Sequence, residues 1–212
     1  DLIFPHHTNE IAQSEGATGK KFVNTWLHAG FLNIDNKRMA KSANNFYTLP
    51  LLKEKGITSL GYRYWLLTAH YRTQINFTDE AVLSAQVALE RLKESSKQIW
   101  NEAKTLDGAI NSAYQAEFQS AINDDLNVSK ALATAWNMLK DTNLDASSKL
   151  ATLLDFDRVF GIGLAEYIEQ SSIESEQAQL IPDEVQALAD QRKIVREQKL
   201  WELEGRQPNS IK

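Results

Sequence analysis

A histidine and a glutamate near the start of the chain have the spacing of two ligands of one metal ion. His6 and Glu10 are four residues apart, so on a helix their side chains project from the same face. An imidazole and a carboxylate suit zinc, which takes four ligands in structural sites. His7 points roughly 100° away and is not expected to join them. On spacing alone, a surface hydrogen bond between His6 and Glu10 is the simpler interpretation.

A short basic segment, Arg38-Met39-Ala40-Lys41-Ser42, follows a predicted strand and places two cations beside a hydroxyl group. An ammonium group on such a loop can stabilise a triphosphate while its charge redistributes in a transition state. For a lone five-residue match, a solvated basic turn is the commoner explanation. Phosphate chemistry at Arg38 and Lys41 therefore needs support from the rest of the chain.

Three further features could contact a nucleotide or RNA. Asp1, beside an apolar segment, could accept hydrogen bonds from a ribose hydroxyl, or could be an exposed terminus. His28, near Trp26, is without context most simply a core histidine. Aromatic and basic residues interleave in segments 62–64 and 70–72, which would allow an RNA-facing surface through stacking and phosphate contacts.

The composition of the chain limits the classes of protein to which it can belong. With 9 Gly and 4 Pro in 212 residues, and many helix-forming residues, it favours a mainly α fold. The absence of cysteine excludes disulfides, a thiolate zinc site supplied by this chain and a cysteine nucleophile. A net charge of −5 argues against a wholly basic nucleic-acid binder, but allows a local basic face. No apolar run is long enough to span a membrane, and a cytoplasmic location is expected.

The elements that must position these residues can be outlined from periodicity and capping residues. A helix is predicted from Pro5 to Ser14 with a stop at Gly16, then a strand pair at 22–28 and 31–35. From Thr48 onward the pattern is helical. Short helices are predicted around Leu51 and after Thr58, longer ones after Thr78, at 109–122, at 128–140 after Asn127 and at 146–160 before Gly161, and a last one after Pro182.

The domain organisation follows from these elements. The chain begins at Asp1 without an initiator methionine, so we expect it to be a fragment of a larger protein. Residues 170–179 are rich in Ser, Glu and Gln and are predicted to be a linker. The predicted parts are the end of a first domain at 1–76, a helical bundle at 77–170, a linker at 171–181 and a charged C-terminal helix and tail at 182–212.

Several ordered motifs resemble those of the cysteinyl-tRNA synthetases. Residues 1–15 are similar to that family's D-L-x-F-P-H-H-E-N-E-I-A-Q-S-E signature. Segments 26–30, 38–42, 61–66, 70–77 and 123–127 resemble, in this order, its W-x-H-x-G, K-M-S-K-S, R-Y-F-L, H-Y-R-S-x-L-N-F/Y and M-D-D-D-F-N motifs. Each motif alone is weak, but their order at family spacing, over about two-thirds of the chain, is specific.

The resemblance implies a fold and an activity. The fold would be the end of a class I, Rossmann-type catalytic domain with a small strand pair, followed by a helical-bundle anticodon-binding domain. The complete enzyme would activate cysteine with ATP and magnesium, and would transfer the cysteinyl group to tRNA(Cys). No membrane partner is implied, and a monomer is expected. This chain by itself is expected to be inactive, because the family's H-I-G-H-type nucleotide motif is absent.

The resemblance also assigns roles by motif position. His6 and Glu10 match two zinc ligands, and the other two, both cysteines, would lie upstream, so the zinc site in this chain is expected to be incomplete. Lys41 and Arg38 match the catalytic signature loop. The residues that would contact the nucleotide are Asp1, His28, Met39, Lys41 and Ser42.

The sequence departs from the family pattern at several motif positions, and it allows two other functions. Arg38 replaces a lysine, Ala40 a serine and Thr8 a glutamate. A non-catalytic RNA-binding or regulatory module that kept the helical bundle is one alternative. A related ligase that joins cysteine to an amino sugar is another, but it would not need the long helical part after Phe77.

Overall fold

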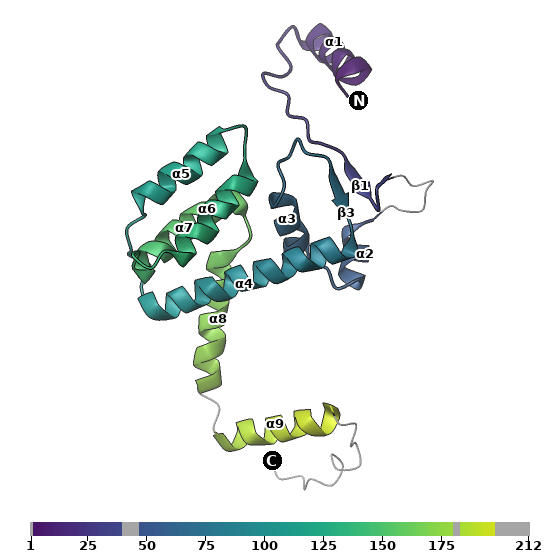
Figure 1. The fold of residues 1–212 in the computed structure, drawn as a ribbon. Coiled ribbons are helices and arrows are strands. Elements are labelled where there is room, and N and C mark those ends of the chain that lie inside the picture. The colour runs from purple at the N-terminus through teal and green to yellow at the C-terminus, as the bar shows by residue number, and fades with distance from the viewer. Residues whose placement is uncertain (1, 40–46, 180–182, 198–212) are drawn as a thin grey trace. The chain divides into compact units, whose positions relative to one another are not determined.

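The structure of the protein is a computed structural model that describes residues 2–39, 47–179 and 183–197 (Figure 1). It is mainly helical with one small sheet, which confirms the predicted secondary-structure class. None of the helices in the described ranges is both long enough and apolar enough to cross a membrane.

The chain divides into two compact units, each assembled from separate stretches of sequence. Unit 1 comprises residues 1–87 and 117–133, and unit 2 comprises residues 88–116 and 134–212. Unit 1 thus contains the N-terminal motifs together with a later helical segment that includes residues 123–127.

The first helix of unit 1 is longer than predicted. A short π-helical turn, η1 (Ile3–His7), leads into α1 (Thr8–Thr18), which continues past the predicted stop at Gly16. An interior glycine costs a helix only about 1 kcal/mol, and Gly16 has open space around it. The helix ends instead at Gly19, where a φ of 64° provides the left-handed cap that glycine favours.

The sheet of unit 1 has three strands, β1 (Leu32–Ile34), β2 (Lys37–Arg38) and β3 (Ile75–Phe77), in the order β2-β1-β3. β1 is antiparallel to β2, and both residues of the turn between them have positive φ, as a tight hairpin requires. β1 is parallel to β3, and this register places two buried side chains, Ile34 and Phe77, opposite each other.

The predicted strand at 22–28 is wrong. Those residues form no strand, and β1, which lies inside the predicted segment 31–35, pairs with β2 and β3 instead. Phe22 and Leu27 are 46% and 64% exposed, so their side chains are not packed as strand residues would be. β-propensity depends on a suitable neighbouring strand, and for β1 that strand is the distant β3.

Threonine residues begin the three helices that accompany the sheet in unit 1. These are α2 (Leu49–Glu54), α3 (Ser59–Leu67) and α4 (Asp79–Ala103). The Thr58 hydroxyl accepts a hydrogen bond from the Gly61 N–H at 3.0 Å, and the Thr78 hydroxyl accepts one from the Ala81 N–H at 3.2 Å. Both predicted caps are confirmed.

Aromatic packing joins α3 to the sheet. Trp65 of α3 meets Phe77 of β3 edge-on, with ring centroids 5.7 Å apart. The buried apolar residues of this part of unit 1 are Ile34, Leu52, Ile57, Tyr64, Trp65, Phe77, Val82 and Ala85.

The remainder of the described chain is helical. It forms α5 (Ser112–Asn123), α6 (Val128–Lys140), α7 (Ala146–Phe160), α8 (Leu164–Gln179) and α9 (Asp183–Glu197). Asn127 caps α6, since its Oδ1 accepts from the Lys130 N–H at 3.2 Å, and Gly161 ends α7 with a φ of 60°, both as predicted. Residues 170–179, predicted to be a linker, continue α8, because Glu and Gln favour helix.

Unit 2 has its own apolar core. Phe156 and Phe160 of α7 are fully buried, and so is Met138 of α6. A further cluster joins Ile99 of α4, Leu150 of α7 and Ile168 of α8. Unit 2 therefore buries side chains from four helices.

Candidate functional site

Three of the predicted nucleotide-binding residues, Asp1, Lys41 and Ser42, lie outside the described residues. Arg38 ends β2, and Met39 follows it. Met39 is half-buried and lines a largely apolar pocket of about 180 Å³. β2 therefore leads directly into the predicted signature loop.

A histidine cluster, defined as His7, Glu10, Trp26 and His28, joins the start of α1 to the segment before β1. Nδ1 of His7 lies 2.8 Å from Oε2 of Glu10, and Nε2 of His7 lies 3.0 Å from Nε2 of His28. The ring of Trp26 stacks on His7 with centroids 4.0 Å apart. His7 thus contacts all three other members, and only 15% of its side chain is exposed.

The hydrogen bonds of His7 determine where the protons lie when both imidazoles are neutral. A carboxylate can only accept, so Nδ1 of His7 donates to Glu10. The other nitrogen of His7 is then an acceptor, and Nε2 of His28 donates to it. With the protons placed in this way, Nδ1 of His28 is left as an acceptor for a further donor.

The prediction for His7 is wrong, because His7 rather than His6 contacts Glu10. Residues three apart on a helix also face each other, so the signal was present in the sequence but was assigned to the other histidine. Among the described residues, no group of three or more His, Asp or Glu side chains could hold a metal ion. The assignment of His6 and Glu10 as zinc ligands stays a prediction.

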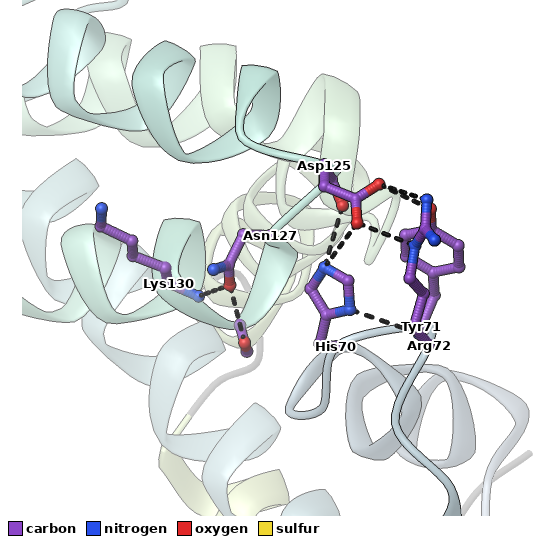
Figure 2. Close-up of polar contacts among 7 residues, drawn as sticks. His70, Tyr71, Arg72, Asp125, Asn127 and Lys130 are labelled. Carbon is purple, nitrogen blue, oxygen red and sulfur yellow. Dashed lines mark hydrogen bonds and ion pairs between the residues drawn. The ribbon is translucent and has the colours of Figure 1, made fainter. Parts of the chain in front are cut away.

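A second cluster, the Asp125 cluster, joins the loop before β3 to the turn between α5 and α6 (Figure 2). The Tyr71 hydroxyl donates to Oδ1 of Asp125 at 2.7 Å, and Nε of Arg72 lies 2.8 Å from Oδ2. Nε2 of His70 lies 2.9 Å from the Asp125 carbonyl oxygen, and the Arg72 N–H donates to Nδ1 of His70 at 3.3 Å. Three consecutive residues of one loop therefore hold a single residue of the other.

These contacts fall on a strained part of the backbone. Asp125 and Leu126 both have left-handed conformations, with φ of 54° and 55°. Such a conformation costs a non-glycine residue on the order of 1 kcal/mol or more and needs support from its surroundings. The Asp125 cluster supplies that support two residues before Asn127, which caps α6. The cluster therefore positions the first turn of α6.

The cluster also changes the acidity of Asp125. The hydrogen bond from Tyr71, aided by Arg72, holds the pKa of the Asp125 carboxyl below its ordinary value, although desolvation opposes this. A lowered folded-state pKa means that the cluster stabilises the fold above about pH 4, near the unfolded value. That contribution is lost as the pH falls through the folded-state pKa. The Arg72 side chain is 65% exposed, so solvent screening keeps the effect modest.

We expect Asp125→Asn to lower the melting temperature by about 3–5 °C at pH 7, because the amide cannot satisfy both Tyr71 and Arg72. The difference from the unsubstituted chain should shrink between pH 5 and pH 3, as the native carboxyl becomes protonated. Thermal circular dichroism at several pH values measures this. The matched control is Asp124→Asn, because no polar contact of the exposed Asp124 carboxylate is seen within the described ranges. A difference of the same size in the control, or one constant down to pH 3, would contradict the prediction.

Comparison with known proteins places these motifs in a family. The family described as tRNA synthetases class I (C) catalytic domain matches residues 1–87. A cysteine–tRNA ligase of Protochlamydia amoebophila is 37% identical over 217 residues, covering 96% of this chain. The resemblance to the cysteinyl-tRNA synthetases is confirmed. Ligases of the same name from Legionella pneumophila and Streptococcus equi subsp. zooepidemicus are each 40% identical over 90% of the chain.

The chain spans less than half the length of these cysteine–tRNA ligases, between 41% and 44% of each. The similarity continues beyond residue 87, through most of the helical part. Both clusters lie in unit 1, and the His70–Arg72 side of the Asp125 cluster lies within the matched residues 1–87.

Proposed function

We propose that this chain is part of a cysteine–tRNA ligase. In that reaction, the cysteine carboxylate attacks the α-phosphate of ATP to give cysteinyl-adenylate and pyrophosphate, and the terminal adenosine of tRNA(Cys) then takes the cysteinyl group and releases AMP. The observation that supports this most is the similarity to cysteine–tRNA ligases along 90% to 96% of the chain. The amino-sugar alternative is disfavoured, since it would not need the helical part that this similarity includes.

Residues around the predicted signature loop would act on the ATP phosphates in the first step. Lys41, with Arg38, would stabilise the negative charge that moves onto the leaving pyrophosphate. ATP would enter with magnesium, which shields the phosphate oxygens. By motif position, the nucleotide would also contact Asp1, His28, Met39 and Ser42.

The residues of this chain do not by themselves fit a zinc ion. His6 and Glu10 would supply two of four ligands, and the Glu10 carboxylate is engaged with His7. No further group of ligands occurs in the described part of the chain. The chemistry proposed for this chain therefore includes no step through zinc.

Binding of the 212-residue chain to tRNA tests the proposal. We expect the chain to bind a tRNA(Cys) transcript about tenfold more tightly than the same transcript with a changed anticodon, and to keep this preference when the salt concentration is doubled. Filter binding or fluorescence anisotropy at two salt concentrations measures the ratio. Equal, salt-sensitive binding to both transcripts would indicate phosphate attraction only and would contradict anticodon recognition by this chain.

The same preparation tests the expected inactivity of the chain alone. Incubation with cysteine, ATP, magnesium and tRNA(Cys) should yield no charged tRNA. Formation of cysteinyl-tRNA by the isolated chain would show that the catalytic machinery is more complete than we propose.

A further inference from the structure

An apolar groove lies open along one face of α8 in unit 2. It encloses about 420 Å³ and is lined by Ile168, Ser172 and Ile173 of α8, together with Trp100 and Leu154. The α8 residues that line the groove lie at positions 165, 168, 169, 172 and 173, the i, i+3, i+4, i+7, i+8 pattern of one helix face. Ile173 is 48% exposed. Of the described residues that line the groove, Glu169 alone is charged.

Helix α9 carries an apolar face that none of the described helices covers. Val185 and Leu188, one turn apart, are 51% and 50% exposed. Arg192 continues this face one further turn along. Ile194, also 50% exposed, lies about 120° around the helix from Leu188. The face is thus two aliphatic side chains followed by one cation.

We propose that α9 folds back and docks its Val185–Leu188–Arg192 face in the groove along α8. Three residues, 180–182, connect the two helices, and so short a connection favours antiparallel neighbours. Ile173 lies six residues before the end of α8, and Leu188 lies five residues after the start of α9. An antiparallel pair therefore brings Leu188 opposite Ile173, at the exposed side of the groove.

The charged residues Glu169 of α8 and Arg192 of α9 support the same antiparallel register. Glu169 lies four residues before Ile173, and Arg192 lies four residues after Leu188. In an antiparallel pair these two positions also face each other. Glu169, the one charged residue among the described residues that line the groove, thus faces Arg192. A register shifted by one turn would leave Glu169 opposite Leu188.

The tether explains why α9, rather than a separate partner, is the occupant. A segment joined by so short a connection has an effective concentration in the millimolar range. A free partner with the same apolar and basic chemistry would have to exceed that concentration to displace it. This docking concerns unit 2 alone and does not depend on the proposed ligase activity.

Thiol reactivity tests the docking, because the chain has no cysteine of its own. Leu188→Cys and Ile194→Cys each introduce a single thiol at equally exposed positions of α9. We expect the Leu188→Cys thiol to react at least about tenfold more slowly with DTNB than the Ile194→Cys thiol, because only the former is covered. Equal rates would overturn the proposal.

Two further variants test whether the groove along α8 is what protects the thiol at position 188. Ile173→Glu, at a half-exposed position, should leave the helical circular dichroism unchanged and should raise the Leu188→Cys rate to that of Ile194→Cys. Protection that survives Ile173→Glu would overturn the proposal. The double variant Ile173→Cys/Leu188→Cys should form a disulfide within one chain on oxidation, whereas disulfide-linked dimers would show that a second copy is the occupant instead.

Discussion

Replacing Lys41 by alanine in the complete ligase is expected to slow cysteine-dependent ATP–pyrophosphate exchange by about a thousandfold, equivalent to about 4 kcal/mol of transition-state stabilisation. The reason is that the ammonium group of the signature loop would stabilise negative charge only as it moves onto the leaving pyrophosphate. An interaction made chiefly in the transition state changes kcat more than KM. Exchange of radiolabelled pyrophosphate into ATP at saturating cysteine measures the rate.

Two controls separate this catalytic role from general effects of charge. Lys37→Ala removes an exposed cation four residues earlier, in β2, and should change the exchange rate less than about twofold. Binding of tRNA(Cys) should be nearly unchanged in Lys41→Ala, because the predicted tRNA-binding surface lies in the helical part. An exchange rate within a few-fold of the unsubstituted enzyme would remove Lys41 from the mechanism.

Local chemistry in the sequence predicts the helices well. Thr58, Thr78 and Asn127 cap their helices as expected, and Gly161 ends α7 in the left-handed conformation. Each of these features depends on residues within one turn of each other, so the sequence around it contains the whole signal. Apolar periodicity, which needs only a helix-length window, likewise indicates α4, α6 and α7.

Features that depend on distant partners could not be predicted in the same way. Segment 22–28 has strand-like residues but forms no strand, while β1 pairs with β3 more than forty residues later. The polar composition of 170–179 predicted a linker, although those residues extend α8. For the strands, local composition leaves two outcomes open and the distant partner decides between them. At 170–179 the helix propensity of Glu and Gln outweighs the linker-like composition.

In the candidate site, too, the sequence predicts individual motifs but does not predict the contacts between distant ones. The motifs at 70–77 and 123–127 were identified separately in the sequence, but nothing in either one indicates that Asp125 meets Tyr71 and Arg72. Likewise, the sequence provides His7, Glu10 and His28, but only the fold brings His28 within 3.0 Å of His7. Motifs therefore predict which residues matter, and the structure adds which of them act together.

Gly30 provides a sharp test of how closely the segments around these clusters are packed. Its N–H donates to the Tyr71 carbonyl at 2.7 Å. A Cβ at this position would lie 2.6 Å from the Thr73 carbonyl oxygen and 2.9 Å from that of Arg72. Because both obstacles are backbone atoms, no side-chain rotation can relieve them. The Gly30 position thus requires the absence of a side chain, which explains the glycine that ends the W-x-H-x-G motif.

We therefore expect Gly30→Ala to lower the free energy of unfolding of unit 1 by about 2–3 kcal/mol, the usual cost of overpacking a rigid site. The strain should be local, so amide hydrogen exchange should increase most at residues 70–77. The contacts of the Asp125 cluster should weaken, so that the cluster no longer stabilises the turn before α6. Gly16→Ala is the matched control, because nothing lies within 4 Å of a Cβ there. Alanine inside α1 should stabilise that helix by up to about 1 kcal/mol. The free energy of unfolding, measured by urea denaturation, should therefore fall in Gly30→Ala and rise in Gly16→Ala. If both variants change the free energy of unfolding equally, the backbone around Gly30 can move to accommodate a Cβ. The contact of Gly30 with residues 71–73 would then not position the Asp125 cluster.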